Sequence, residues 1–358
     1  MKNTKILAIN PGSTSTKISV YYGEEHIFTK SLNHSSEELS RFAKITDQFS
    51  FRKEIIINNI KEAGIDLQTI QLAIGRGGLI KPIPSGVYEV NEAMKYDLIS
   101  GYLGEHASNL GGLIADDIAK SLSSVKAYIA DPVVVDEMND IARYSGHPLF
   151  KRLSIFHALN QKAIARAHAK NVNLKYEEMN LIVAHIGGGV TVGAHCNGRV
   201  IDVNNGLDGE GPFSPERSGT LPAGALVRAI YSRKYSMVEI LKMIKGNGGL
   251  MAYLGTNSAL EVEQRMLQGD KEAEEIFEAM AYQVAKAIGE MAVVLYCNID
   301  AILLTGGVAY SKWFVNKITE RVKNLAPVYI YPGEDEMKAL AYNGLLVSTG
   351  VIKAKIYI

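Results

Sequence analysis

The order of predicted elements repeats in the two halves of the chain, and this repeat constrains the fold more than any other feature. Each half begins with three strands joined by a tight turn and a hairpin loop. These strands span residues 6–9, 17–22 and 26–28, and again 181–184, 190–194 and 199–202. In each half, helices follow, and then a strand that runs into paired glycines. We therefore expect two α/β domains of similar plan that face each other across a cleft, with the glycine-rich turns lining it.

The expected boundary between these domains lies near the middle of the chain. We place an N-terminal domain at 1–155 and a C-terminal domain at 156–358, with a helix over 156–169 at the junction. Other helices are predicted over 36–63, 223–267 and 271–297. The apolar stretch 345–358 either packs a subunit interface or completes a domain core.

Composition removes several classes of function. Lys plus Arg (38) equals Asp plus Glu (38), so a zero net charge offers no basic footprint for nucleic acid or an anionic membrane. No run of 18 or more apolar residues is present, and the N-terminus lacks a signal-peptide pattern, so we expect a cytoplasmic protein. The two cysteines, Cys196 and Cys297, are too few for a disulfide framework, and we expect both to be buried.

The turn between the first two strands has the chemistry of an anion site. It runs from Asn10 to Lys17 and includes Gly12, Ser13 and Thr14. A glycine allows close backbone approach, successive N–H groups and hydroxyls surround anionic oxygens, and the lysine adds a positive charge. The spacing differs from a Walker A loop, because a single glycine precedes a β-branched strand here.

Two further glycine turns suit phosphate groups. The second consists of His185 followed, after Ile186, by Gly187, Gly188 and Gly189. The third, Gly306-Gly307, precedes a predicted helix from Lys312 and so suits a phosphate or nucleoside at a helix start. Taken alone, the Gly-Gly pair is also an ordinary strand-to-helix turn.

Phosphoryl transfer needs cations around the moving group and a metal ion on the phosphates. Arg76 and Arg217 lie in predicted loops and carry the planar guanidinium that matches phosphate or carboxylate. For either arginine taken alone, a surface salt bridge is the better interpretation. His157 and His185 are possible hydrogen-bond donors, and Asp131 follows the strand 125–130. The acidic run 334–336 is a possible magnesium site or a partner of the helix dipole.

The segment from Ile9 to Lys17 resembles the N-terminal signature of the acetate and butyrate kinases, N-x-G-S-[ST]-[ST]-x-K. The resemblance extends from Asn10 to about Glu336. It implies the actin-like ATPase superfamily, whose two duplicated ribonuclease H-like α/β domains close over ATP. The C-terminal domain would then carry the nucleotide-binding loops.

The resemblance also assigns roles, residue by residue. Active-site groups would be Arg76, Arg217, the transition-state histidine His157 and the aspartate Asp131. The phosphate and nucleotide contacts would come from Gly12, Ser13, Thr14, Lys17, His185, Gly187, Gly188, Gly189, Gly306 and Gly307. Magnesium would be held by Asn10 and by one acidic residue, which is Asp335 in a gap-free match and otherwise Glu336.

Three departures point to the butyrate kinase branch of the family. The Phe-His-Gly-Thr-Ser-His typical of acetate kinases is Phe-His-Ala-Leu-Asn-Gln at 156–161, and their Arg-Ser-Gly-Asp is replaced by a segment that ends in Thr220. The third loop reads Val-Ala-Tyr at 308–310 instead of Gly-Glu-Asn. The resemblance implies reversible, magnesium-dependent transfer of a phosphoryl group from ATP to a short-chain fatty acid. ADP and an acyl phosphate are the products, and Arg76 would hold the carboxylate.

Other activities remain open at this point. Acetate or propionate kinase differs from butyrate kinase by a few methylenes, each worth only about 1–3 kcal/mol in a pocket. A sugar or polyol kinase of the same superfamily would need a carboxylate base, and an actin-like or chaperone-like ATP switch would polymerise or bind peptides. We expect the protein to form a homo-oligomer and to bind a small carboxylate as its substrate.

Overall fold

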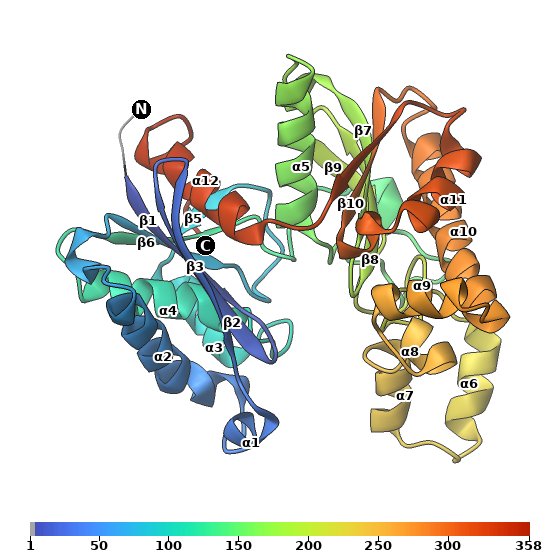
Figure 1. Ribbon diagram of the computed structural model, residues 1–358, viewed down its shortest axis with the longest axis horizontal. Coiled ribbons are helices and arrows are strands. Elements are labelled where there is room, and N and C mark those ends of the chain that lie inside the picture. Colours follow the sequence, from blue (N-terminus) through green and yellow to red (C-terminus); the bar gives the residue numbers. More distant parts are fainter. Residues whose placement is uncertain (1–3) are drawn as a thin grey trace. The chain divides into compact units, whose positions relative to one another are not determined.

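The computed structural model describes residues 4–358, which form two compact units (Figure 1). Unit 1 contains the chain up to Val135 together with Asp335–Ile358, and unit 2 contains Asp136–Glu334. This division differs from the expected boundary at residue 155 in two ways: unit 2 begins earlier, and the C-terminal segment belongs to unit 1. The segment belongs there because helix α12 (Glu336–Ser348) packs on strands of that unit.

Unit 1 is built on a six-stranded mixed sheet with the order β3-β2-β1-β4-β6-β5. Its strands are β1 (Lys5–Pro11), β2 (Ser15–Tyr22), β3 (Glu25–Asn33), β4 (Leu72–Arg76), β5 (Val87–Glu89) and β6 (Lys126–Ala130). Its other helices are α1 (Ser36–Leu39), α2 (Phe49–Glu62), α3 (Glu92–Ser100) and α4 (Asn109–Lys120). Strand β1 is antiparallel to β2 and parallel to β4, which places the ends of β1 and β4 at one sheet edge.

Alternation along β1 explains how this sheet is covered. Leu7 and Ile9 join the core cluster that includes α4, whereas Ile6 contacts α12 near Gly344. Both sets are fully buried. The C-terminal stretch 345–358 therefore completes a core, since Tyr357 is buried and donates a hydrogen bond to Asp97 at 2.5 Å.

Unit 2 is built on a five-stranded mixed sheet with the order β11-β10-β7-β8-β9. Its strands are β7 (Asn180–Ile186), β8 (Val190–Cys196), β9 (Arg199–Val203), β10 (Ala301–Gly306) and β11 (Val328–Pro332). Its helices are α5 (Ala158–Asn171), α6 (Ala223–Tyr231), α7 (Met237–Ile244), α8 (Gly249–Leu254), α9 (Ala259–Leu267), α10 (Lys271–Val294) and α11 (Lys312–Val322). The antiparallel pair β7–β8 and the parallel pair β7–β10 repeat the plan of β1, β2 and β4.

The two faces of this sheet are covered by different helices. Ile182, Ala184 and Ile186 of β7 pack in the cluster that contains α10 and α11, while Leu181 and Val183 pack with α5. Residues that differ by one position therefore lie on opposite faces, as the two-residue period of a strand requires.

All the predicted strands are present, but two predicted helices are interrupted. The region 36–63 contains α1, a 3-10 turn (Ile45–Gln48) and α2, because Lys44 N donates to Asp47 Oδ2 at 3.0 Å and starts a new helical turn. The region 223–267 forms four helices, with left-handed glycines at Gly249 (φ 60°) and Gly255 (φ 71°). Cys297 was expected to be buried and is exposed, in a left-handed turn after α10.

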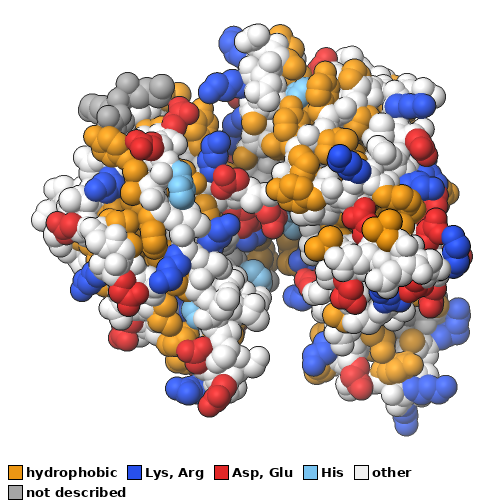
Figure 2. Space-filling model, in the orientation of Figure 1, with side chains coloured by type: hydrophobic (Ala, Val, Ile, Leu, Met, Phe, Trp, Pro, Cys, Tyr) orange, Lys and Arg blue, Asp and Glu red, His pale blue; other side chains and the backbone are white. Residues whose placement is uncertain are grey.

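Surface charge agrees with the composition. On the face drawn in Figure 2, acidic and basic side chains are interspersed over both units. Within residues 4–358, no helix has the length and apolar character needed to cross a membrane.

Candidate active site

A buried arginine holds the turn between β1 and β2. The Arg52 guanidinium, from α2, donates to the carbonyl oxygens of Gly12 at 2.8 Å, Ser15 at 3.0 Å and Ser13 at 3.1 Å. The side chains of Ser13 and Thr14 remain exposed. The backbone of the predicted anion turn is thus fixed from inside the unit, while its hydroxyls face outward.

Arg52 is not among the residues predicted from the sequence. It is fully buried, donates further hydrogen bonds to Thr16 Oγ1 (2.9 Å) and Gln48 Oε1 (3.0 Å), and burial lowers its pKa to about 10. The group therefore remains charged at neutral pH. One signal was available: Arg52, Ile56 and Ile60 are four residues apart, so the arginine lies on the apolar face of its helix.

Three side chains meet near the carboxyl ends of β1 and β4, two central strands of the unit 1 sheet. The Asn10 amide donates to the Glu336 carboxylate, and Arg76 Nη1 lies 3.1 Å from Glu336 Oε2 and 3.4 Å from Asn10 Oδ1. The β1–β4 register pairs Ile9 with Gly75, which places Asn10 beside Arg76, and the first residue of α12 completes the group. We call these three residues the Asn10 cluster.

The glycines around Arg76 have a packing role. A β-carbon on Gly75 would stand 2.2 Å from the Gly111 carbonyl oxygen, and one on Gly77 would stand 2.5 Å from Cβ of Pro132. The backbone before Arg76 therefore approaches α4 closely, and the backbone after it approaches the segment that follows β6.

The two acidic candidates for the metal have different surroundings. Asp335 accepts a hydrogen bond from Lys338 N at 3.0 Å and caps α12, as the expectation about the helix dipole allows. Glu336 turns toward Asn10 and Arg76 instead. Lys17 is paired with Asn10 across β1 and β2.

The Asn10 cluster fits magnesium in its donor types. An amide oxygen and a carboxylate are the ligands that this ion takes, usually one or two from protein with phosphates and waters in the other positions. Within residues 4–358 no group of three or more His, Cys, Asp and Glu side chains is placed to hold a metal ion. A site that recruits phosphate oxygens is therefore a better match than an all-protein site.

Asp131 has a local role in the structure. It is buried with φ 37°, and its Oδ1 accepts hydrogen bonds from Ser85 Oγ at 2.6 Å and Gly86 N at 2.8 Å. It follows β6, whose Ala130 pairs with Arg76 of β4. Asp131 therefore lies one strand from Arg76 and fixes the turn 85–86.

A second group of predicted residues gathers in unit 2, at the ends of β7 and β8. The rings of His157 and His185 stack with centroids 4.2 Å apart, and His185 Nε2 lies 3.2 Å from Glu334 Oε2. His157 Nδ1 lies 2.9 Å from Thr191 Oγ1. We call His157, His185, Thr191 and Arg217 the His157 cluster.

Arg217 joins this cluster through the glycine turn. A β-carbon on Gly189 would stand 1.9 Å from Arg217 Nη1, so the guanidinium lies directly against this glycine. Nη1 also donates to the Gly206 carbonyl oxygen at 2.7 Å. Gly187 approaches His185 (3.2 Å from Cβ to Nε2), whereas Gly188 meets Glu216 at an ordinary 3.5 Å.

The third glycine turn lies beside the second. Gly306 has φ 95°, and a β-carbon there would stand 2.4 Å from the Ile186 carbonyl oxygen, at the end of β7. Gly307 has open space around it and begins the 3-10 turn Gly307–Tyr310, which precedes α11.

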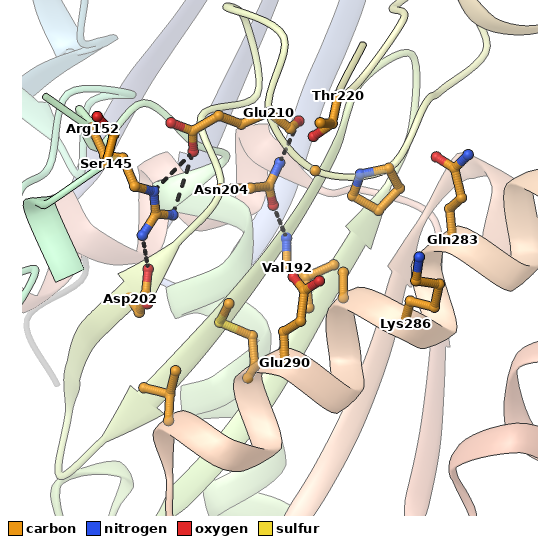
Figure 3. A pocket seen from close by; sticks show the side chains of 15 residues that line it. Ser145, Arg152, Val192, Asp202, Asn204, Glu210, Thr220, Gln283, Lys286 and Glu290 are labelled. Carbon is orange, nitrogen blue, oxygen red and sulfur yellow. Dashed lines mark hydrogen bonds and ion pairs between the residues drawn. The ribbon is translucent and has the colours of Figure 1, made fainter. Parts of the chain in front are cut away.

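A cavity of about 630 Å³ in unit 2 lies on the face of the sheet that packs against α10, opposite the face covered by α5 (Figure 3). It includes Val192, which packs with α10, and none of the predicted site residues. Three of its charged side chains are paired with one another, because Arg152 lies 2.9 Å from Asp202 and 3.3 Å from Glu210 (Figure 3).

Two mixed α/β units with this strand order have the actin-like ATPase fold. The crystal structure of Porphyromonas gingivalis acetate kinase matches 96% of this chain and 100% of its own with a TM-score of 0.77, at 17% identity. The match shows the fold.

The chain belongs to the Acetokinase family, whose model matches residues 145–349. Butyrate kinase 2 of Clostridium acetobutylicum is 56% identical over 353 residues, which is 99% of both chains. Butyrate kinase 1 of the same organism is 55% identical over the same coverage.

Proposed function

We propose that this protein is an ATP-dependent carboxylate kinase that phosphorylates a short-chain fatty acid, butyrate or a branched analogue, reversibly. The full-length identity of 56% to a butyrate kinase is the observation that carries this proposal. Membership of a kinase family implies ATP or ADP as the second substrate. The reaction breaks the bond from the γ-phosphorus to the bridging oxygen and forms one to a carboxylate oxygen.

In unit 2, the His157 cluster would stabilise the moving phosphoryl group. Arg217 lies against Gly189, so an anion on this turn would contact backbone N–H groups and a guanidinium together. His157 would add one hydrogen-bond donor. Such preorganised donors act by electrostatic stabilisation, which is usually the largest contribution to this kind of catalysis.

In unit 1, the Asn10 cluster would hold magnesium and the acid. Asn10 and Glu336 offer the oxygens, and the bound ion would neutralise charge on the phosphates. Glu336 would then exchange its contact with Arg76 for the metal, which would leave Arg76 to bind the carboxylate substrate. We prefer Glu336 to Asp335 because Asp335 caps α12.

No general base is required for this reaction. A fatty-acid carboxylate is ionised at neutral pH, since the pKa of such a group is about 4. In this structure Asp131 Oδ1 accepts hydrogen bonds from Ser85 and Gly86, and the proposed reaction asks for no proton transfer to it. A kinase acting on a hydroxyl would need a carboxylate placed to remove a proton.

Hydroxylamine trapping tests the proposal. Purified protein with ATP and Mg²⁺ is given acetate, propionate, butyrate, isobutyrate or valerate, and the acyl hydroxamate is measured. We expect the highest kcat/KM with butyrate or isobutyrate. A maximum with acetate or propionate would replace the proposed substrate with the shorter acid, and phosphorylation of glycerol or glucose alone would refute a carboxylate kinase.

We also propose a cytoplasmic homo-oligomer that binds neither nucleic acid nor membrane. The balanced charge supports the proposal that the protein binds neither nucleic acid nor membrane. The homo-oligomer is supported by α6, which buries none of its residues, and by exposed apolar side chains of α6 and α7: Val227, Ile230, Tyr231, Met237 and Val238. Light scattering after size-exclusion chromatography measures the mass, and a monomer at micromolar concentration would contradict the proposal.

A further inference from the structure

The orientation of one buried amide fixes a chain of hydrogen bonds behind His157. Gln161, on α5, is fully buried, and its Nε2 lies 3.0 Å from the Thr191 carbonyl oxygen. A carbonyl oxygen only accepts, so this position must hold the NH₂ group. The second hydrogen of Nε2 then points to Thr191 Oγ1, at 2.9 Å, and Oε1 faces His195.

His195 must donate to this amide. Its Nε2 lies 3.0 Å from Gln161 Oε1, which can only accept. Burial, together with the charges of Lys162 and Arg166, lowers the pKa of His195 well below its usual value, so the ring is neutral and carries one proton. That proton is on Nε2, and Nδ1 accepts from Tyr176 Oη at 2.8 Å.

The Thr191 hydroxyl continues this chain of hydrogen bonds to His157, with the hydroxyl as donor. Its Oγ1 has two N–H donors nearby, Gln161 Nε2 at 2.9 Å and the His157 backbone N at 3.5 Å. The third group in reach is His157 Nδ1, at 2.9 Å, and it is the one that can accept the hydroxyl proton. Nδ1 of His157 is therefore an acceptor, and its ring proton is on Nε2.

We propose that Tyr176, His195, Gln161 and Thr191 are positioning residues that hold His157 as the neutral tautomer with its proton on Nε2. Each link donates in one direction, so the last ring presents an N–H group on the side away from Thr191. Only the use of this donor, on the transferring phosphoryl group, rests on the proposed function.

One glycine makes room for the chain. A β-carbon on Gly193 would stand 2.6 Å from Gln161 Oε1 and 3.4 Å from His195 Nε2. Gly193 lies between Thr191 and His195 on β8 and is not in a left-handed conformation. The backbone therefore does not require a glycine here, and the missing side chain leaves room for the Gln161 amide. Gly193→Ala is thus a second variant that disturbs the chain without removing any member of it.

Nitrogen-15 NMR of histidine-labelled protein tests the inference directly. The spectrum of His157→Asn assigns the His157 signals. In the wild type at neutral pH we expect an unprotonated Nδ1 and a protonated Nε2. Thr191→Val removes the hydroxyl at constant shape and should mix the tautomers, whereas the matched control Thr191→Ser keeps the hydroxyl and the wild-type signals.

Kinetics provide a second readout. Thr191→Val should lower kcat by about 10- to 100-fold, as when a group that orients a reactive side chain is removed, with KM values little changed. Thr191→Ser should restore most of kcat. A wild-type Nδ1 that carries a proton would overturn the inference, and so would a Thr191→Val protein whose His157 signals are unchanged. If the expected NMR signals are found but no carboxylate is phosphorylated, the inference stands and the proposed function fails.

Discussion

The two units support equivalent strand–turn–strand elements by different chemistry. In unit 1, the charged Arg52 donates to three backbone carbonyls of the turn between β1 and β2. In unit 2, the neutral Gln161 and Thr191 lie behind the turn between β7 and β8, and the cation Arg217 contacts the glycine turn itself. The same topology therefore places a positive charge inside the unit in one case and against the glycines in the other.

A threonine hydroxyl performs the same task in both places. Thr16 Oγ1 accepts from Arg52 at 2.9 Å and lies 2.9 Å from His34 Nε2, as Thr191 lies between Gln161 and His157. Each hydroxyl accepts a hydrogen bond from a side-chain N–H group and also lies within hydrogen-bond distance of a histidine ring nitrogen. The two histidines differ in solvent exposure, since His34 is buried and His157 is half-buried. We infer that the unit 1 arrangement maintains structure and the unit 2 arrangement serves chemistry.

The largest effect is expected where the cation contacts a glycine. Gly189→Ala should displace Arg217, because the new β-carbon would overlap its guanidinium, and kcat for acyl phosphate formation should fall by about 10²–10³. The matched control Gly188→Ala meets only an ordinary contact with Glu216 and should retain most of kcat. Similar kcat values for the two variants would contradict the assigned role of Arg217.

The next effect separates the two acidic residues at α12. Glu336→Gln should raise the Mg²⁺ concentration for half-maximal activity by about 10- to 100-fold, because a metal carboxylate is lost. Asp335→Asn keeps a helix cap and should shift this concentration less than about twofold. Titration of activity with Mg²⁺ measures both, and the reverse order would return the metal to Asp335.

A smaller effect should follow from loss of the internal cation of unit 1. Arg52→Met removes the donor to three carbonyl oxygens, of which Ser15 O keeps a second partner, Gly12 N at 2.7 Å. The variant should raise KM for ATP about tenfold, with a loss of about 1–3 kcal/mol in unfolding free energy. Arg41→Met removes an exposed arginine and is the control for charge. If KM for ATP were unchanged in Arg52→Met, the turn would not need this support.

The smallest effect concerns pH and His34. Burial, and then the charge of Arg52, lowers the pKa of His34 below 6.5, although Glu38 opposes the shift. His34 therefore binds a proton more readily in the unfolded chain than in the folded one. The stability that comes from burying His34 in its neutral form is complete above the unfolded pKa and is lost as pH falls below about 6.5. His168 and His195 shift in the same direction. Chemical denaturation from pH 7.5 to 5 should therefore show a slightly weaker pH dependence for His34→Gln than for the wild type, and an identical dependence would refute the contribution of His34.

The strands and glycine turns could be predicted because their signals are local. Apolar runs bounded by turn residues predicted β1, β2, β7, β8 and β10. The family resemblance already placed Asn10 and an acidic residue at 335 or 336 in one site. The packing of the rest of α12 on β1 could not be predicted, because no local pattern in 335–358 indicates a partner more than 300 residues away.

Arg52 and Gln161 were missed for a related reason. A charged or amide side chain on a helix usually faces water, and only the surrounding contacts show that these two are buried. The choice of Glu336 over Asp335 also needed coordinates, since neighbouring residues at a helix start point in different directions. The sequence thus predicted candidate reacting groups, and the structure shows which contacts hold them.

The central claim is that a carboxylate is the phosphoryl acceptor, and the reverse reaction tests it most directly. Protein, Mg²⁺, ADP and butyryl phosphate are mixed, and ATP is measured by luciferase. We expect rapid ATP formation whose rate falls by about 10²–10³ in Arg217→Ala. A protein that binds ADP but forms no ATP from butyryl, propionyl or acetyl phosphate would contradict it.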